Sequence, residues 1–212
     1  MDSKGKMLAS LLLIVLPVIL GFLTYTQLPD QMAIHWGING EANGTADKLS
    51  GLLIVPIISV FLLALFAFIP RIDPLKKNYA SFRKYYDSFV IVMIGFLSYI
   101  QLLVLFWNLS VPFNFTRMMA FGFGAMFYYL GLLLENAKPN WFVGIRTPWT
   151  LSSNNVWDKT HKMGGKLFKS VGIVTFIGAI IFEEMLIVSV ALIIAASLAT
   201  VVYSYLEFKK LK

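Results

Sequence analysis

The chain contains no cysteine among its 212 residues and comparatively few charged residues. Without cysteine it has no disulfide framework, no thiolate nucleophile and no zinc ribbon. Charged residues make up 14% of the chain, against about 25% in an average soluble protein, and hydrophobic residues make up 58%, against about 45–50%. This apolar excess is larger than the core of a soluble globule of this length can bury. The composition therefore argues against a soluble domain and indicates a membrane protein.

Apolar runs of the length needed for transmembrane helices recur along the chain. A helix needs about 20 mainly apolar residues to cross about 30 Å of hydrocarbon at about 1.5 Å per residue. Four runs of suitable length cover residues 7–26, 51–69, 88–108 and 118–134. A further run, 167–206, is 40 residues long and is interrupted only by Glu183 and Glu184, so we interpret it as two short helices in a tight hairpin. The first of these, 167–182, would reach only about 24 Å and would have to thin the bilayer or begin in the interface.

The distribution of Lys and Arg predicts the orientation of the helices, because cytoplasmic loops are enriched in basic residues. With the N-terminus inside, the inner segments hold 16 of the 18 basic residues, and the outer segments hold only Lys48 and Arg117. The sequence therefore predicts an all-α integral protein of the plasma membrane with six transmembrane helices and both termini in the cytoplasm (N-in/C-in). A five-helix arrangement is the alternative, but it would scatter these charges on both sides.

The formal net charge of +7 divides along the same lines. The inner segments hold 16 basic and 6 acidic residues, a net charge of +10, and the outer segments hold 2 and 5, a net charge of −3. The basic excess thus reflects orientation in the lipid bilayer and does not indicate a nucleic-acid partner. The weakly acidic outer face is expected to attract a cationic peptide at modest ionic strength.

One outer and one inner connection are long. The outer loop, 27–50, is rich in Gly, Asn and Asp and is predicted to form turns, with an extended piece at 32–36. The inner loop, 135–166, is too rich in Trp, Phe, Pro and Gly to be disordered. We divide the chain into an N-terminal two-helix unit, 1–69, and a four-helix unit, 70–212.

Capping residues within the inner loop predict a short helix at 154–163. Ser153 is a suitable N-cap, and the pair Gly164 and Gly165 is a suitable C-terminal stop. Such a helix would carry uncharged side chains on one face and lysines on another, namely Val156, Thr160 and Met163 against Lys159, Lys162 and Lys166. This pattern is typical of a helix that lies in the headgroup layer.

Ionisable residues within the bilayer would indicate transport, because they are costly there and usually functional. Glu183 and Glu184 are the candidates, either as solvated carboxylates in an outer turn or as an intramembrane acid site. His35 and His161 fall on opposite sides of the membrane and do not form a common site. Asp158 precedes His161 by three residues and would meet it on one helix face.

None of these spacings matches a metal-binding or catalytic motif. The sequence therefore predicts no metal, no cofactor and no enzymatic activity. An enzyme built around His35, or around Asp158 and His161, stays an alternative.

Small residues and tryptophans indicate how the helices pack and where the membrane ends. Small residues four apart are expected at helix interfaces, in the rows Ala191, Ala195, Ala199 and Ala120, Gly124. These rows also leave a homodimer open. Tryptophans near the predicted membrane borders are expected to be interfacial anchors, namely Trp36, Trp107, Trp141 and Trp149.

Both long loops resemble known sequence signatures. The inner loop from Asn140 to Gly165 reads NWFVGIRTPWTLSSNNVWDKTHKMGG. Its blocks G-I-R-T-P-W-T-L and V-W-x-x-T-H-x-x-G closely resemble the signature of the SdpI family of bacterial membrane immunity proteins. The outer loop from Leu28 to Gly40, L-P-D-Q-M-x-I-H-W-x-x-x-G, resembles the domain of unknown function that accompanies this signature. Together with the six-helix plan, the resemblance covers nearly the whole chain.

The resemblance implies binding rather than catalysis. The best-known members protect their producer from a secreted peptide toxin and, when toxin is present, hold a small winged-helix autorepressor at the membrane. The resemblance implies the same two partners for this chain. Two alternatives stay open, an unspecified membrane role within the same family and a small-molecule or peptide transporter that uses Glu183 or Glu184.

Two sets of residues are the predicted contact sites under this resemblance. The inner set, for the cytoplasmic partner, consists of Gly144, Arg146, Pro148, Trp149, Trp157, Thr160 and His161, of which Gly144 and Pro148 are expected to shape the turn. The outer set, for the toxin, consists of Asp30, His35, Trp36 and Glu41. In the alternative interpretation, the inner loop only closes the cytoplasmic face, with Arg146 bound to carbonyls or to Asp158, and the outer loop is only a folded cap.

Overall fold

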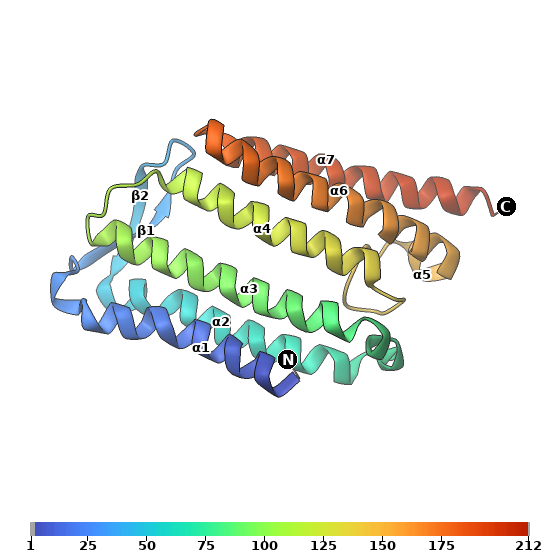
Figure 1. Cartoon of the computed structure of the whole chain (residues 1–212), viewed down its shortest axis with the longest axis horizontal. Helices are drawn as coiled ribbons and strands as arrows, with labels where there is room; N and C mark the ends of the chain where they lie inside the picture. Colours follow the sequence, from blue (N-terminus) through green and yellow to red (C-terminus); the bar gives the residue numbers. More distant parts are fainter. Residues whose placement is uncertain (1–2, 212) are drawn as a thin grey trace.

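The computed structural model describes residues 3–211, in which six long helices run side by side and a β-hairpin covers one end (Figure 1). The long helices are α1 (Ser3–Leu23), α2 (Lys48–Ile72), α3 (Tyr79–Asn108), α4 (Phe115–Asn136), α6 (Asn154–Ile181) and α7 (Met185–Lys209). The remaining elements are the short helix α5 (Pro148–Ser152), the strands β1 (Gln31–Trp36) and β2 (Ala42–Asp47), and the 3-10 turns η1 (Tyr25–Gln27) and η2 (Lys76–Asn78). All six long helices are long and apolar enough to cross a membrane, which confirms the predicted fold class.

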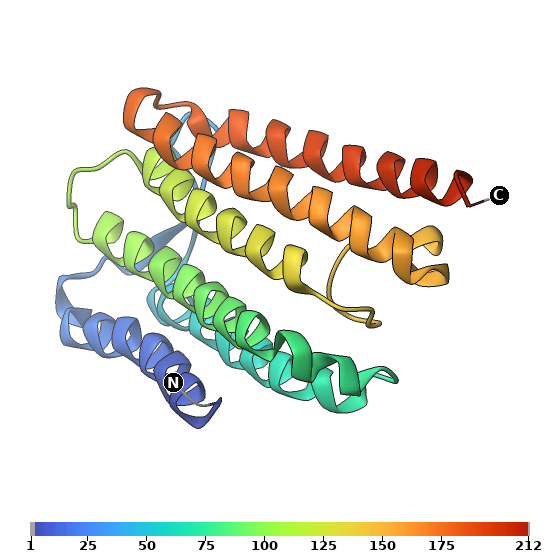
Figure 2. The same cartoon turned by 45° about the vertical axis from the view of Figure 1, so that its right-hand side comes forward.

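The helices form two groups that meet along α3 and α4. Helices α1, α2 and α3 pack together, as do α4, α6 and α7 (Figure 2). The N- and C-terminal ends of the described chain lie at the end of the bundle that carries α5, and the hairpin lies at the opposite end (Figure 1). The basic residues predict that the end with the termini faces the cytoplasm, and this orientation stays a prediction. The division of the chain into units 1–69 and 70–212 also stays a prediction. Residues 1, 2 and 212 of these units lie outside the described part.

Helix α6 corrects the prediction of a short helix in the headgroup layer. Ser153 caps it as predicted, since its side chain accepts a hydrogen bond from the Val156 N–H. Gly164 and Gly165 do not end it, and α6 continues unbroken for 28 residues. This length corresponds to about 42 Å at about 1.5 Å per residue, so the bilayer need not thin. The Val156 and Thr160 side chains are buried in the bundle rather than in headgroups.

Close packing explains why Gly164 and Gly165 lie inside α6: a Cβ atom at Gly164 would collide with the Ile145 side chain, and Gly165 lies against the backbone of α4. Two glycines of α4, Gly124 and Gly131, face two of α6, Gly172 and Gly165, in a contact that we call the glycine crossing. A Cβ atom at Gly131 would lie 2.6 Å from the Gly165 carbonyl oxygen, and one at Gly172 would lie 2.7 Å from that of Gly124. Both distances are far below van der Waals contact. The glycines that locally resemble a helix end therefore allow close packing against α6.

The small-residue rows have different outcomes. Ala120 and Gly124 are buried, which confirms the interface predicted on α4. Ala191, Ala195 and Ala199 are exposed on α7, so the interface predicted there within the bundle is wrong, and a homodimer through this row stays a prediction. The face of α7 that is buried carries small hydroxyl residues instead, namely Ser189, Thr200 and Ser204, together with Ala196. Each of these hydroxyls donates to a carbonyl oxygen three residues earlier in the helix, which allows burial without an unpaired polar group.

Helix α3 holds the hairpin to the bundle. The extended piece predicted at 32–36 lies within β1, which pairs with β2 in antiparallel register. The Asn108 side chain at the end of α3 accepts from the Ala33 N–H at 2.8 Å and donates to the Ala33 carbonyl at 2.9 Å. Asp47 ends β2 and caps α2 by accepting from the Ser50 N–H at 3.0 Å. The outer loop is thus a folded cover fixed at both α2 and α3.

Candidate functional site

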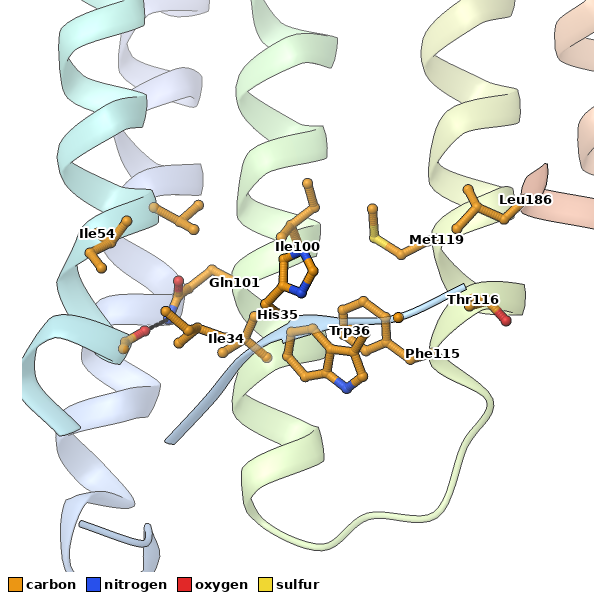
Figure 3. Close-up of a pocket in the computed structure, with 14 residues that line it drawn as sticks. Ile34, His35, Trp36, Ile54, Ile100, Gln101, Phe115, Thr116, Met119 and Leu186 are labelled. Atoms are coloured by element: carbon orange, nitrogen blue, oxygen red, sulfur yellow. Dashed lines mark hydrogen bonds between the residues drawn. The ribbon is translucent and has the colours of Figure 1, made fainter. Parts of the chain in front are cut away.

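A cavity of about 300 Å³ lies under the hairpin, at the end of the bundle that the basic residues predict to face outward (Figure 3). We call it the outer pocket. Strand β1 closes one side through Ile34, His35 and Trp36, and the walls come from α2, α3 and α4, with one residue of α7. The walls are mainly apolar and include Ile54, Val55, Ile100, Val104, Met119 and Leu186. A concave, mostly apolar cavity with a few polar groups is the usual form of a ligand site.

Trp36 joins the hairpin to the wall of the outer pocket. Its ring stacks on Phe115 of α4 with centroids 3.7 Å apart and planes 8° apart. Trp107 meets the same ring edge-on at 5.7 Å. Such aromatic pairs contribute about 0.5–1.5 kcal/mol beyond the burial of area. The stack therefore fixes β1 against α4 at the place where the pocket forms.

Gln101 supplies the pocket with a buried hydrogen-bond acceptor. Its side chain is 1% exposed, and its Nε2 donates to the Gly51 carbonyl oxygen at 3.1 Å (Figure 3). Its Oε1 atom is buried and has no hydrogen-bond partner. A buried acceptor without a donor is costly, so this atom favours a ligand that carries an N–H or O–H group. The hydrogen bond to Gly51 also joins α3 to α2 beside the pocket.

The structure separates the four predicted outer residues into two pairs. His35 and Trp36 line the outer pocket, and His35 Nδ1 lies 2.5 Å from Asn43 Oδ1. Asp30 and Glu41 lie on the exposed surface of the hairpin region, where Asp30 pairs with Lys48 at 3.1 Å. Within residues 3–211, no three His, Cys, Asp or Glu side chains are placed to hold a metal ion.

Glu183 and Glu184 lie in the turn between α6 and α7, as the turn interpretation predicts. Both residues are exposed. Glu183 forms an ion pair with Arg117 at 3.0 Å and accepts a hydrogen bond from Asn114 Nδ2 at 3.3 Å. These contacts tie the α6–α7 turn to the start of α4. The two carboxylates are therefore exposed groups at the end of the bundle that begins α4.

At the opposite end, the inner loop folds over the start of α6. His161 is 1% exposed, its Nε2 accepts from the Ile145 N–H at 2.9 Å, and its Nδ1 lies 2.9 Å from the Trp157 carbonyl oxygen. These partners assign a neutral ring with the proton on Nδ1. Gly144 has φ +122°, and a Cβ atom there would collide with His161 Nε2. Glycine is thus required at this position.

Only part of the predicted inner set is accessible. Trp157, Thr160 and His161 are buried in the bundle, and the Trp157 indole donates to the Ala137 carbonyl oxygen at 2.9 Å. Arg146 is exposed and donates to the Trp141 carbonyl oxygen at 2.6 Å. In this conformation the buried residues shape the loop and do not contact a partner directly.

The remaining members of the inner set lie beside α7. Pro148 begins α5 directly after the cap residue Thr147. Trp149 is half-buried against Tyr205 of α7 with centroids 5.1 Å apart. The accessible part of the inner set therefore consists of Arg146, Pro148 and Trp149.

The predicted contact between Asp158 and His161 is wrong. Asp158 is exposed and lies 3.5 Å from Lys138 Nζ, whereas His161 is turned into the loop and stacks on Trp157. Both nitrogen atoms of the imidazole are satisfied by backbone groups. The pair therefore does not form a hydrolytic dyad.

Sequence reasoning missed a buried polar cluster that anchors the inner loop to α3. Asp73 is 2% exposed and accepts from the Leu75 N–H, the Trp141 N–H and the Tyr79 hydroxyl. Asn140 is fully buried and accepts from the backbone N–H groups of Phe142 and Val143. The only local sign of Asp73 is that it precedes a proline at a helix end, which marks a turn but gives no indication of a distant partner.

Comparison with known proteins agrees with the two sequence signatures. The profile of the SdpI/YfhL protein family matches residues 136–204, and that of a domain of unknown function, DUF1648, matches residues 12–60. The chain is 24% identical over 207 residues to "Immunity protein SdpI" of Bacillus subtilis (strain 168), covering 97% of each chain. No solved structure matches. The two profiles cover the inner loop with α6 and α7, and the outer loop with its flanking helices.

Proposed function

From the match of residues 136–204 to the SdpI/YfhL family, we propose that this multi-pass plasma-membrane protein confers immunity to a secreted peptide toxin. The observation that carries the proposal is the similarity to an immunity protein along 97% of both chains. The shared region includes all six spans and both long loops. Immunity by binding needs an accessible outer surface and no chemical step, and the outer pocket supplies such a surface.

The outer pocket favours a cationic, amphipathic peptide as the toxin. Its volume of about 300 Å³ accommodates apolar side chains, and the unpaired Gln101 Oε1 atom offers an acceptor to a peptide donor. Asp30, Glu41, Glu183 and Glu184 are exposed around this end of the molecule. Acidic groups raise the local concentration of a cationic ligand and speed its association at low ionic strength.

Protection of a sensitive host tests the proposal. We expect cells that express the protein to survive higher concentrations of at least one antimicrobial peptide in a panel of cationic, membrane-active peptides. Matched cells that carry the empty vector provide the baseline. No protection across the panel would remove the immunity proposal and would leave the family assignment intact.

The positions of Glu183 and Glu184 weigh against the transporter alternative. Neither glutamate is buried, and Glu183 is already paired with Arg117. We expect the double variant Glu183→Gln, Glu184→Gln to keep its protection at physiological salt, where exposed charges are largely screened. If the variant lost protection together with flux of a labelled peptide, the transporter would become the better account.

The accessible part of the inner set suits a second partner, a small winged-helix autorepressor held at the membrane. Arg146 carries an exposed guanidinium and Trp149 a half-buried indole on neighbouring turns of the loop. Arginine and tryptophan dominate the energetics of protein interfaces. The buried residues Trp157 and His161 position this loop through hydrogen bonds with the backbone of Ala137 and Ile145.

Recruitment of such a repressor is expected to depend on Arg146. Arg146→Ala removes one exposed hydrogen bond to the Trp141 carbonyl oxygen, so the fold should change little. We expect capture of a repressor encoded beside the gene to fall at least about ten-fold, a typical hot-spot effect, with membrane insertion intact. Lys138→Ala, which removes an exposed cation from the same loop, is the matched control. Equal capture by Arg146→Ala and the original protein would refute the assignment.

A further inference from the structure

A second cavity lies between α1, α2 and α3, at the end of the bundle that carries the chain termini. Its volume is about 410 Å³, and we call it the inner cleft. Four charged residues line it, namely Lys6, Arg71, Arg83 and Asp87. The rest of its surface is mainly apolar and includes Leu63, Phe66 and Val90. The cleft is formed by different helices from those that carry the inner loop.

The charges of the inner cleft are not balanced. Asp87 is shared by two cations, because Arg83 Nε lies 2.7 Å and Lys6 Nζ 4.0 Å from its carboxylate oxygens. Among residues 3–211, Arg71 makes no ion pair with an acidic side chain. Among the described residues that line the cleft, three cations stand against one carboxylate, a net charge of +2. Apolar walls screen this charge poorly, so it favours an anionic ligand.

The polar and apolar parts of the cleft lie at different depths. Lys6 is in the first turn of α1, Arg71 in the last turn of α2 and Arg83 near the start of α3. Leu63 precedes Arg71 by eight residues, which places it about 12 Å further along the helix toward the bundle centre at about 1.5 Å per residue. Val90 lies two turns beyond Arg83 in the same direction. The cleft is thus cationic at its mouth and apolar below.

We propose that the inner cleft binds an anionic phospholipid of the inner leaflet. The phosphodiester lies among Lys6, Arg71 and Arg83, and an acyl chain runs along Leu63, Phe66 and Val90. A free phosphate ion would use the cations alone, whereas the apolar depth of the cleft requires an amphiphile. Basic cavities between transmembrane helices on the cytoplasmic side are suited to lipid headgroups. The proposal stands independently of the immunity proposal, because neither the outer pocket nor the inner loop contributes to the cleft.

Native mass spectrometry of the full-length protein in detergent tests the charge requirement. We expect phosphatidylglycerol to bind and phosphatidylcholine to bind much more weakly. Arg71→Gln is expected to weaken phosphatidylglycerol binding about five-fold, the effect of one basic residue near an anionic headgroup. Lys77→Gln removes an exposed cation from η2, at the same end of the bundle but outside the cleft, and is expected to weaken binding less than about two-fold. Equal loss in both variants would show general attraction to a basic surface and overturn the proposal.

A pair of uncharged variants tests the cleft itself. Ala67 lines the cleft, and Ala67→Phe is expected to fill it and to abolish phosphatidylglycerol binding without a change of charge. Ala64→Phe on the same helix is the control, since Ala64 is exposed and does not line the cleft. Retained binding by Ala67→Phe would overturn the proposal, as would displacement of the lipid by millimolar inorganic phosphate, which would show a simple anion site. Equal melting temperatures of the two variants would confirm that both are folded.

Discussion

Replacing Gly172 with alanine is expected to lower the free energy of unfolding by about 3 kcal/mol, the upper end of the usual cost of overpacking. A Cβ atom at this position would meet backbone atoms of Tyr128 and would lie 2.7 Å from the Gly124 carbonyl oxygen. Side-chain ends can rotate away from such a contact, but backbone atoms cannot. The alanine would therefore force α4 and α6 apart along the glycine crossing.

Gly95→Ala is the matched control for this prediction. The same methyl group at Gly95 of α3 meets only Leu13 Cδ1, at 3.7 Å, an ordinary van der Waals contact. Alanine is favoured over glycine in a helix by up to about 1 kcal/mol, so this variant should be as stable as the original protein or more stable. The free energy of unfolding of both variants is measured in mixed micelles as the fraction of denaturing detergent is raised. Equal stability of Gly172→Ala and the original protein would contradict the close crossing.

Loss of Trp36 is expected to remove most of the protection against the toxin. Trp36→Ala eliminates the stack on Phe115 and opens one side of the outer pocket. If the stack and the lost contact area together contribute at least about 1.4 kcal/mol, the toxin concentration that cells survive should fall at least about ten-fold. Growth in a toxin dilution series measures the effect, and immunoblotting of membranes shows whether the variant accumulates normally.

Two further variants separate the role of the Trp36 ring from a general effect of losing tryptophan. Trp36→Phe keeps a ring to stack on Phe115 and should retain most of the protection. Trp141→Ala removes a tryptophan that is 50% exposed in the inner loop, far from the outer pocket, and should leave protection unchanged. Full protection by Trp36→Ala would show that the toxin does not depend on this side of the pocket.

The parts of the fold that local patterns determine could be predicted from the sequence. Apolar run length predicts the six spans, because each must cross the same thickness of hydrocarbon. The Ser153 cap and the extended piece at 32–36 are also local, since neighbouring residues decide them. Gly164 and Gly165 carry the local pattern of a helix end, but α6 continues because Gly164 packs against Ile145 and Thr200 and Gly165 against the backbone of α4. No pattern within α6 alone contains that information.

The candidate site could be predicted only where its residues are adjacent in the sequence. His35 and Trp36 belong to one recognisable segment and do line the outer pocket. Gln101 and Phe115 come from α3 and α4 and reach the pocket only through tertiary packing. At the inner end, membership in the signature motif does not distinguish surface from interior: Trp157 and His161 are buried, whereas Arg146 of the same loop is exposed.

The glycine crossing also limits how the two ends of the molecule communicate. Two contacts of backbone against backbone, Gly124 with Gly172 and Gly131 with Gly165, fix the register of α4 against α6 at points two turns apart. A piston-like shift of one helix past the other would drive side chains into both contacts. Helix α4 begins at Phe115, on which Trp36 stacks, and ends at Asn136, where the inner loop starts. Helix α4 therefore connects the aromatic stack under the hairpin directly to the start of the inner loop, and the crossing holds α6 to it in one register.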